Sequence, residues 1–228
     1  MAWQGFLAII PAMRKKIPKF KAVIFDMDGV ITNTMPYHFD AWFKVLNDAG
    51  IKINCYDVYE REGQPGVNTI KELSRERKMK ISDKEARAIL LKKEKLFKRI
   101  VKTRFIKGSR PFLRKLKKRK IIMGLVTGTS RHEMKRILPK YLRQMFNVTV
   151  TGDEVRKGKP HPEPFLKALS ILGLKSKDVA VIENAPFGIE SAKRAGLFCI
   201  ALETSLPKKY LRRADIILKS FKDLEKMV

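Results

Sequence analysis

The chain has 228 residues, 44% of them hydrophobic, and its 50 Lys and Arg against 23 Asp and Glu give a formal net charge of +27 at pH 7. This length and apolar content suffice for one large domain, or for a domain plus a small insertion, with its own core, and they exclude a disordered chain. The positive charge favours anionic partners: phosphates, nucleic acids or acidic membrane surfaces. Two cysteines, Cys55 and Cys199, exclude a disulfide framework and indicate a reducing compartment; we expect neither to be catalytic.

Residues 1–19 contain a short apolar run followed by basic residues. A secretory signal places its charge first, and this run is too short to span a bilayer. We therefore interpret residues 1–19 as an N-terminal extension. We expect a cytoplasmic protein without a membrane partner.

Two aspartates follow the first apolar run, in the segment VIFDMDGVITNT at 23–34. Asp26 and Asp28 are close enough to repel each other unless a cation lies between them or one is protonated. Either arrangement is useful for phosphoryl transfer. A hard divalent cation with oxygen ligands, most simply Mg²⁺, would hold both.

Residues 33–105 show only helical periodicity, in segments 37–50, 66–78 and 82–101. No strand-like run separates them, which predicts a helical insertion after the first strand. On the first of these helices, we expect Trp42 and Phe43 to lie in the core of the insertion rather than to contact a substrate.

From residue 106 onward, short apolar runs alternate with helical patterns. This rhythm predicts an α/β fold, in which a Rossmann-like parallel sheet core (20–32 and 106–228) carries an inserted α-helical cap domain (33–105). Ligands of such sheets bind outside the carboxyl ends of the strands. The predicted strands are 121–126, 146–150, 179–183, 198–202 and 214–218, and the predicted helices are 130–142, 162–173 and 186–196.

A basic stretch at 107–120 contains no acidic residue. Its apolar positions mark an amphipathic helix that starts after Gly108 and Ser109, so a solvated helix face is one interpretation. A docking surface for nucleic acid is the other.

Four candidate polar groups should meet at one edge of the predicted sheet. Asp26 ends the first strand, Thr127 follows the second, Lys159 lies in the loop RKGKPHPEPF, and Glu183 and Asn184 follow the strand VAVI. Each of these motifs alone is common in turns, caps and loops. Together and in this order, they point to one catalytic site.

These motifs, followed by GIESAKRAG, resemble the haloacid dehalogenase-like hydrolase superfamily over residues 20–228. The resemblance implies that Asp26 is a nucleophile that forms an aspartyl-phosphate, and that Asp28 protonates the leaving oxygen and then activates water. It makes Thr127 a hydrogen-bond donor to phosphate and Lys159 the cation that offsets negative charge. Dehalogenases and phosphonate-cleaving members lack an acid at position 28, so Asp28 points to phosphate esters.

The resemblance also implies a Mg²⁺ site formed by Asp26, the main-chain carbonyl of Asp28 and the motif at Glu183 and Asn184. Most relatives have a second acid where this chain has Asn184. An amide oxygen still suits Mg²⁺ but carries no charge, which should weaken the metal site and makes Glu183 its main acidic ligand there. A degenerate site that only binds is the alternative.

The insertion resembles the small helical cap of the beta-phosphoglucomutase-like subfamily, above all in YHFDAWFKVLNDAGI. That resemblance implies that His38 and Lys93 help to organise the general acid, although His38 also suits a packing role. Gly66 replaces an arginine that grips the non-transferring phosphate in the mutase. Beside Thr127, we expect Gly128 and Thr129 to bind substrate.

The leading hypothesis is therefore a Mg²⁺-dependent phosphatase that acts on a small phosphorylated metabolite, a sugar or polyol phosphate. A phosphosugar mutase, which would yield an isomerised phosphosugar, is the alternative. A nucleic-acid-binding protein on an enzyme scaffold is more remote, since no recognised nucleic-acid motif is present. Its binding would depend steeply on salt and would survive Asp26→Asn.

Overall fold

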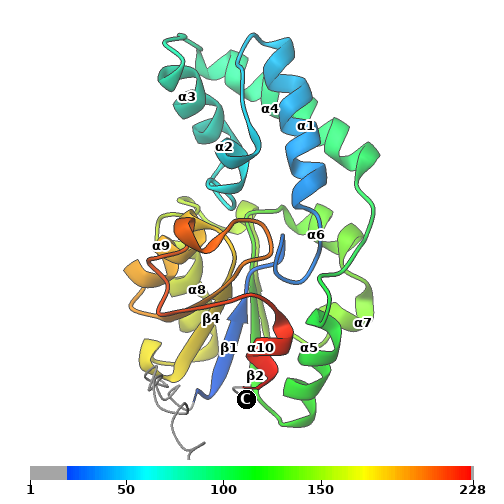
Figure 1. Cartoon of the computed structure of the whole chain (residues 1–228), viewed down its shortest axis with the longest axis vertical. Coiled ribbons are helices and arrows are strands. Elements are labelled where there is room, and N and C mark those ends of the chain that lie inside the picture. Colours follow the sequence, from blue (N-terminus) through cyan, green and yellow to red (C-terminus); the bar gives the residue numbers. More distant parts are fainter. Residues whose placement is uncertain (1–19, 227–228) are drawn as a thin grey trace, which may run out of the picture.

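The computed structural model describes residues 20–226 and has a parallel sheet at its centre (Figure 1). The predicted N-terminal extension at 1–19 lies outside the described residues. Six strands pair in the order β3-β2-β1-β4-β5-β6, and every neighbouring pair is parallel. The predicted α/β fold is confirmed. The strands are β1 (Ala22–Phe25), β2 (Ile122–Val126), β3 (Val148–Val150), β4 (Val179–Glu183), β5 (Phe198–Leu202) and β6 (Ile216–Leu218).

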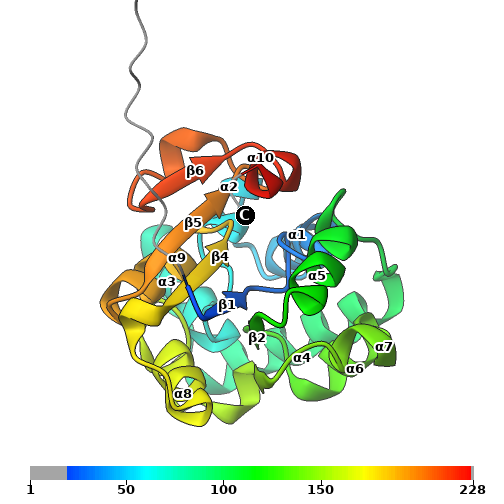
Figure 2. The same ribbon diagram turned by 90° about the horizontal axis from the view of Figure 1, so that it is seen from below.

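Side chains alternate between the two faces of the sheet, and each face is covered by helices. Phe25 packs in one core cluster with residues of α5 (Ser109–Lys118) and α10 (Phe221–Glu225). The neighbouring Ile24 packs in a second cluster with residues of α8 (Glu163–Leu172) and α9 (Pro186–Arg194). Figure 2 shows these helix pairs on opposite sides of the strands. Burial on both faces explains why the strands are almost purely apolar.

The helix predicted at 130–142 is interrupted. It forms α6 (Arg131–Ile137) and α7 (Lys140–Arg143), with Leu138 extended at φ −93° and ψ 119°. The cause is Pro139, which has no N–H to donate and disfavours helical conformation in the residue before it.

The basic stretch at 107–120 contains the predicted amphipathic helix, α5. Phe112, Leu113 and Leu116 are buried on one side, while the basic side chains lie mostly on the other. The interpretation of this stretch as a helix face is confirmed. Its proposed use for nucleic acid stays a prediction.

A helical insertion follows β1, as predicted, and lies beyond the carboxyl ends of the strands (Figure 1). A bridge between Thr32 and Phe105 joins the two connections to the sheet, and the exact division at 33 and 105 stays a prediction. Its helices are α1 (Met35–Asp48), α2 (Cys55–Tyr59), α3 (Gly66–Glu76) and α4 (Asp83–Ile100). The short α2 was not predicted; it starts in a capping box formed by Asn54 and Asp57.

The insertion has its own apolar core, in which Trp42 is 7% exposed beside Leu46 and Ile70. The prediction that Phe43 belongs to this core is wrong, because its side chain is 44% exposed. One residue along a helix turns the side chain by about 100°, so Phe43 leaves the stripe that faces α4. Among the described residues, no helix is long and apolar enough to cross a membrane.

Candidate active site

The predicted site residues meet at the carboxyl edge of three adjacent strands. Asp26 comes directly after β1, Thr127 directly after β2, and Glu183 is the last residue of β4. Parallel pairing aligns Phe25 with Leu125 on one side and with Ile182 on the other, so the polar residues that follow come out side by side. Asp26 and Glu183 are fully buried and Thr127 is 3% exposed.

Lys159 links two of the buried carboxylates. Its Nζ lies 2.6 Å from Asp26 Oδ1 and 2.6 Å from Glu183 Oε1, and the side chain is 1% exposed. Burial opposes the charge on the amine, but Asp26 and Glu183 outweigh burial and raise the pKa of Lys159 above its ordinary value. A permanent cation is therefore held beside Asp26.

Asp26 has one oxygen on Lys159, and its other oxygen, Oδ2, is buried without a hydrogen-bond partner. Burial, together with the charges of Glu183 and Asp28, raises the pKa of Asp26 to about 8 despite the opposing effect of Lys159. These surroundings disfavour the charged form of Asp26, and a second cation beside it would offset them. Bound Mg²⁺ would stabilise its charged form.

Asn184 supplies a second unpartnered oxygen at this edge. Its Nδ2 donates to Ser205 Oγ at 2.8 Å, while its Oδ1 is buried without a partner. With Asp26 Oδ2, this amide oxygen forms an oxygen donor set that fits Mg²⁺. Within residues 20–226, no group of three or more His, Cys, Asp or Glu side chains is arranged to hold a metal ion. A cation here would therefore depend on amide and carbonyl oxygens as well as on carboxylates.

Glu183 was expected to be the main acidic metal ligand of its motif, but both of its oxygens already have partners. Oε1 accepts from Lys159, and Oε2 accepts from the backbone N–H groups of Asn184 at 2.9 Å and Ala185 at 3.3 Å. A Cβ at Gly188 would lie 1.9 Å from Oε1, so only glycine fits beside this carboxylate. Direct coordination by Glu183 stays a prediction; its observed contacts hold Lys159.

Asp28 is surrounded by donors. Its Oδ1 accepts from Thr34 Oγ1 at 2.5 Å and lies 3.4 Å from His38 Nε2, while its Oδ2 accepts from Thr129 Oγ1 at 2.9 Å and Thr127 Oγ1 at 3.2 Å. Burial acts to raise the pKa of Asp28, but His38 and the hydroxyl donors outweigh burial and lower it to about 2. The two aspartates thus lie in opposite electrostatic surroundings, as acid and base partners often do.

His38 and Lys93, the two cap residues expected at the site, lie next to each other. Lys93 Nζ is 3.0 Å from His38 Nδ1, and the His38 ring stacks on Phe97 with centroids 4.0 Å apart. Burial and the charge of Lys93 lower the pKa of His38, against the opposing effect of Asp28. His38 therefore both packs in the cap and lies beside Asp28.

Sequence reasoning missed the contact between the cap loop at 60–66 and the catalytic edge. Gly63 has φ +80°, and a Cβ there would lie 2.4 Å from Lys159 Cδ. A Cβ at Gly128, expected to bind substrate, would lie 2.5 Å from Gly63 Cα. The feature of the sequence that could have indicated this contact is the presence of two glycines within REGQPG. Gly66 begins α3, where a Cβ would lie 2.4 Å from Leu90 Cδ1.

A cavity of about 270 Å³ lies between the cap and the carboxyl edge of the sheet. Cap and core both contribute to its lining. Among its lining residues are His38, Glu62, Lys93, Gly128, Thr129 and Glu133. Two of these residues, His38 and Thr129, also contact Asp28, so the cavity adjoins the surroundings of that carboxylate.

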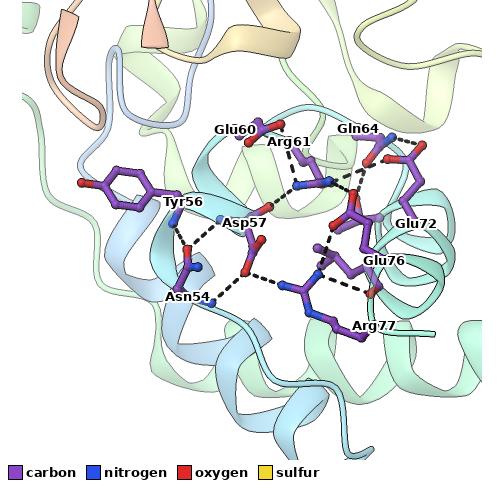
Figure 3. Close-up of polar contacts among 11 residues, drawn as sticks. Asn54, Tyr56, Asp57, Glu60, Arg61, Gln64, Glu72, Glu76 and Arg77 are labelled. Atoms are coloured by element: carbon purple, nitrogen blue, oxygen red, sulfur yellow. Dashed lines mark hydrogen bonds and ion pairs between the residues drawn. The ribbon is translucent and has the colours of Figure 1, made fainter. Parts of the chain in front are cut away.

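The cap loop is held by a polar network, shown in Figure 3. Arg61 donates to Glu76 Oε1 at 2.5 Å, and Gln64 Nε2 donates to Glu72 Oε1 at 2.9 Å. Arg77, at the end of α3, donates to Asp57 Oδ2 at 2.6 Å. These contacts join the loop and α2 to α3, so the residues between them are presented in one arrangement.

The fold is a parallel sheet with an inserted helical cap, and the buried aspartate that follows its first strand contacts a lysine. These features are those of a class of phosphoric monoester hydrolases. The family of haloacid dehalogenase-like hydrolases matches residues 23–202. The chain belongs to this family, and within it lies close to the beta-phosphoglucomutase-like subfamily, as the resemblance of the motifs predicted.

Similar proteins include a mutase and a phosphatase. The chain is 30% identical to a beta-phosphoglucomutase from Bacillus subtilis (strain 168) over 224 residues, 90% of this chain and 91% of that one. It is 33% identical to a phosphorylated carbohydrates phosphatase from Thermotoga maritima over 184 residues, 78% of this chain and 82% of that one. The crystal structure of a hydrolase from Pseudomonas syringae superposes with a TM-score of 0.80 at 26% identity, covering 90% and 96% of the two chains.

Proposed function

We propose that the protein is a Mg²⁺-dependent phosphatase that hydrolyses a phosphorylated sugar or polyol through an aspartyl-phosphate at Asp26. One observation carries the proposal: Asp26 and Asp28 are both fully buried at one strand end, in opposite surroundings. Asp26 has an unpartnered oxygen beside the Lys159 cation, and Asp28 lies in a ring of donors below the cap cavity.

In the first displacement, an oxygen of Asp26 attacks phosphorus as the bond from phosphorus to the leaving oxygen breaks. That oxygen takes a proton from Asp28, which carries it in the substrate complex, where Thr127 and Thr129 donate to the phosphoryl oxygens instead of to Asp28. In the second displacement, Asp28 removes a proton from water, the water oxygen attacks phosphorus, and the bond to Asp26 breaks with release of phosphate. Lys159 stabilises the charge on Asp26 and on the phosphoryl oxygens.

Mg²⁺, held by Asp26, the carbonyl of Asp28 and Asn184, would neutralise charge on the transferring phosphoryl group. Thr127 and Thr129, whose hydroxyls now donate to Asp28, are placed to donate to phosphoryl oxygens when substrate is bound. Glu183 acts through Lys159, which it holds by one oxygen.

Hydrolysis is favoured over mutase activity by the cap side of the cavity. A mutase must hold a second phosphate, and Gly66 offers no side chain for that purpose. Arg61 also lines the cavity, but Glu72 and Glu76 engage its guanidinium at 3.6 and 2.5 Å. The carbohydrate part of the proposal is supported by the Thermotoga maritima relative, a phosphorylated carbohydrates phosphatase. The Bacillus subtilis relative keeps the mutase as the second candidate.

The test is phosphate release from a panel of sugar phosphates, polyol phosphates and an aryl phosphate, with Mg²⁺ or with EDTA. We expect Asp26→Asn to reduce turnover by about a thousandfold or more, because the nucleophile is lost. Asp48→Asn, the same change at an exposed position on α1, is the matched control and should keep full activity. Formation of an isomerised phosphosugar without phosphate release would favour the mutase instead.

A further inference from the structure

Glu62 is a buried acid that the mechanism does not use. Its residue is 9% exposed, and it lines the cavity between cap and core. Across residues 20–226, no hydrogen bond or ion pair engages its carboxyl group. Its oxygens are not among the fully buried atoms that lack a partner. They therefore face the cavity, where water or a bound ligand can reach them.

The position of Glu62 is well determined by its neighbours on the loop. On one side, Arg61 donates to Glu76 and to the backbone oxygen of Asp57 at 3.2 Å (Figure 3). On the other side, the left-handed Gly63 packs against Lys159 and Gly128 without room for a Cβ. Because both flanks are fixed, Glu62 is held at the wall of the cavity between cap and core.

The surroundings of Glu62 favour a neutral hydrogen-bonding partner. Burial, and then the charges of Asp28 and Asp26, raise its pKa well above the ordinary value, against Lys159 and Lys93. A carboxyl group that holds a proton can donate to a hydroxyl as well as accept from one. Glu133 also lines the cavity, so a second anionic group on the leaving group would meet another carboxyl.

We propose that Glu62 is a specificity-determining residue, which hydrogen-bonds a hydroxyl of the leaving group and so selects monophosphates of polyhydroxy compounds. This inference rests on the proposed function, because it takes the cavity to be the leaving-group site. A leaving group without hydroxyls leaves Glu62 unsatisfied. A leaving group that bears a second phosphate or a carboxylate is disfavoured by the acids of the cavity.

The test compares the binding of glycerol 3-phosphate and propyl phosphate, which have the same chain length and differ in two hydroxyls. Dissociation constants are measured by calorimetry with Mg²⁺ in the Asp26→Asn background, so that turnover plays no part. Glu62→Ala should lower the preference for glycerol 3-phosphate about tenfold, the usual size of one buried hydrogen bond. Glu62→Gln, which keeps hydrogen-bonding groups of the same size, should keep most of the preference.

Glu60→Gln is the matched control, since Glu60 lies on the same loop, exposes 42% of its side chain and does not line the cavity. It should leave the preference unchanged. An unchanged preference in Glu62→Ala, or an equal loss in Glu60→Gln, would overturn the inference. Failure of the proposed function has a different signature: no Mg²⁺-dependent phosphate release by the wild-type protein from any compound of the panel, aryl phosphate included.

Discussion

The core half and the cap half of the site are built in different ways. In the core half, Lys159 contacts both Asp26 and Glu183 at 2.6 Å, at the ends of two adjacent strands. In the cap half, a network behind the loop holds the backbone, and Glu62 faces the cavity without a partner. Groups that must perform one reaction are fixed by each other. In the cap half, the loop backbone is positioned by hydrogen bonds on the side away from the cavity, and the side chains proposed to contact substrate face the cavity.

Removal of the core cation should have the largest effect. Lys159→Met leaves Asp26 and Glu183 as buried carboxyls without their shared cation, so we expect a loss of about 3–5 kcal/mol in the free energy of unfolding. Urea unfolding measures it. Lys193→Met is the matched control: Lys193 pairs with Asp215 at 2.7 Å in a half-buried position, and its loss should cost about 1 kcal/mol or less. Equal losses in the two variants would show that the buried contacts of Lys159 stabilise the fold no more than the half-buried pair of Lys193 and Asp215 does.

The contact between the two halves can be broken at Gly63. Gly63→Ala puts a methyl group 2.4 Å from Lys159 Cδ at a φ of +80°, which should cost about 2–3 kcal/mol through strain and overpacking. A lower kcat/KM should accompany the loss of stability, because the loop lies against Lys159, the cation of the proposed mechanism. Gly173 has φ +64° and no heavy atom within 4 Å of an added Cβ. Gly173→Ala should therefore cost about 1 kcal/mol and leave kcat/KM unchanged.

The metal affinity of the core half should respond to Asn184. Asn184→Asp adds a carboxylate beside Asp26 and should lower the Mg²⁺ concentration for half-maximal activity about tenfold. A titration of activity against Mg²⁺ measures this shift, and a rise in Tm with Mg²⁺ supplies a second readout. Asn68→Asp adds the same charge at an exposed position of α3 and should leave the titration unchanged. An unaltered titration in Asn184→Asp would contradict the placement of Asn184 at the metal.

The smallest effect is expected on the outer face of the cap. Lys44 and Asp48 form an exposed pair at 2.7 Å, four residues apart on α1. Lys44→Ala should change the free energy of unfolding by about 0.5 kcal/mol or less, because solvent screens such pairs. Thermal unfolding measures it. A loss comparable to that of Lys159→Met would contradict the distinction between buried and exposed charges.

The periodicity of apolar residues predicted the strands, most helices and the helical insertion. It failed at Pro139, which interrupts the helix predicted at 130–142, and at Phe43, whose side chain is exposed instead of lying in the core of the insertion. Asp26, Thr127 and Glu183 could be found because each follows or ends an apolar strand, and parallel strands bring such positions to one edge. The short helix α2 was missed, because five residues are too few to show a period.

The sequence by itself thus determined which candidate site residues lie at one edge of the sheet, since the alternation of strands and helices dictates which positions share one end of a parallel sheet. Only the tertiary structure decided what each group touches. Glu183 engages Lys159 and backbone amides, Asn184 keeps a free oxygen, and Glu62 enters the cavity. No periodicity or residue spacing in the sequence predicts that a cap loop contacts a strand end far along the chain. That contact exists because the insertion folds back over the sheet, where two glycines allow the backbones to meet.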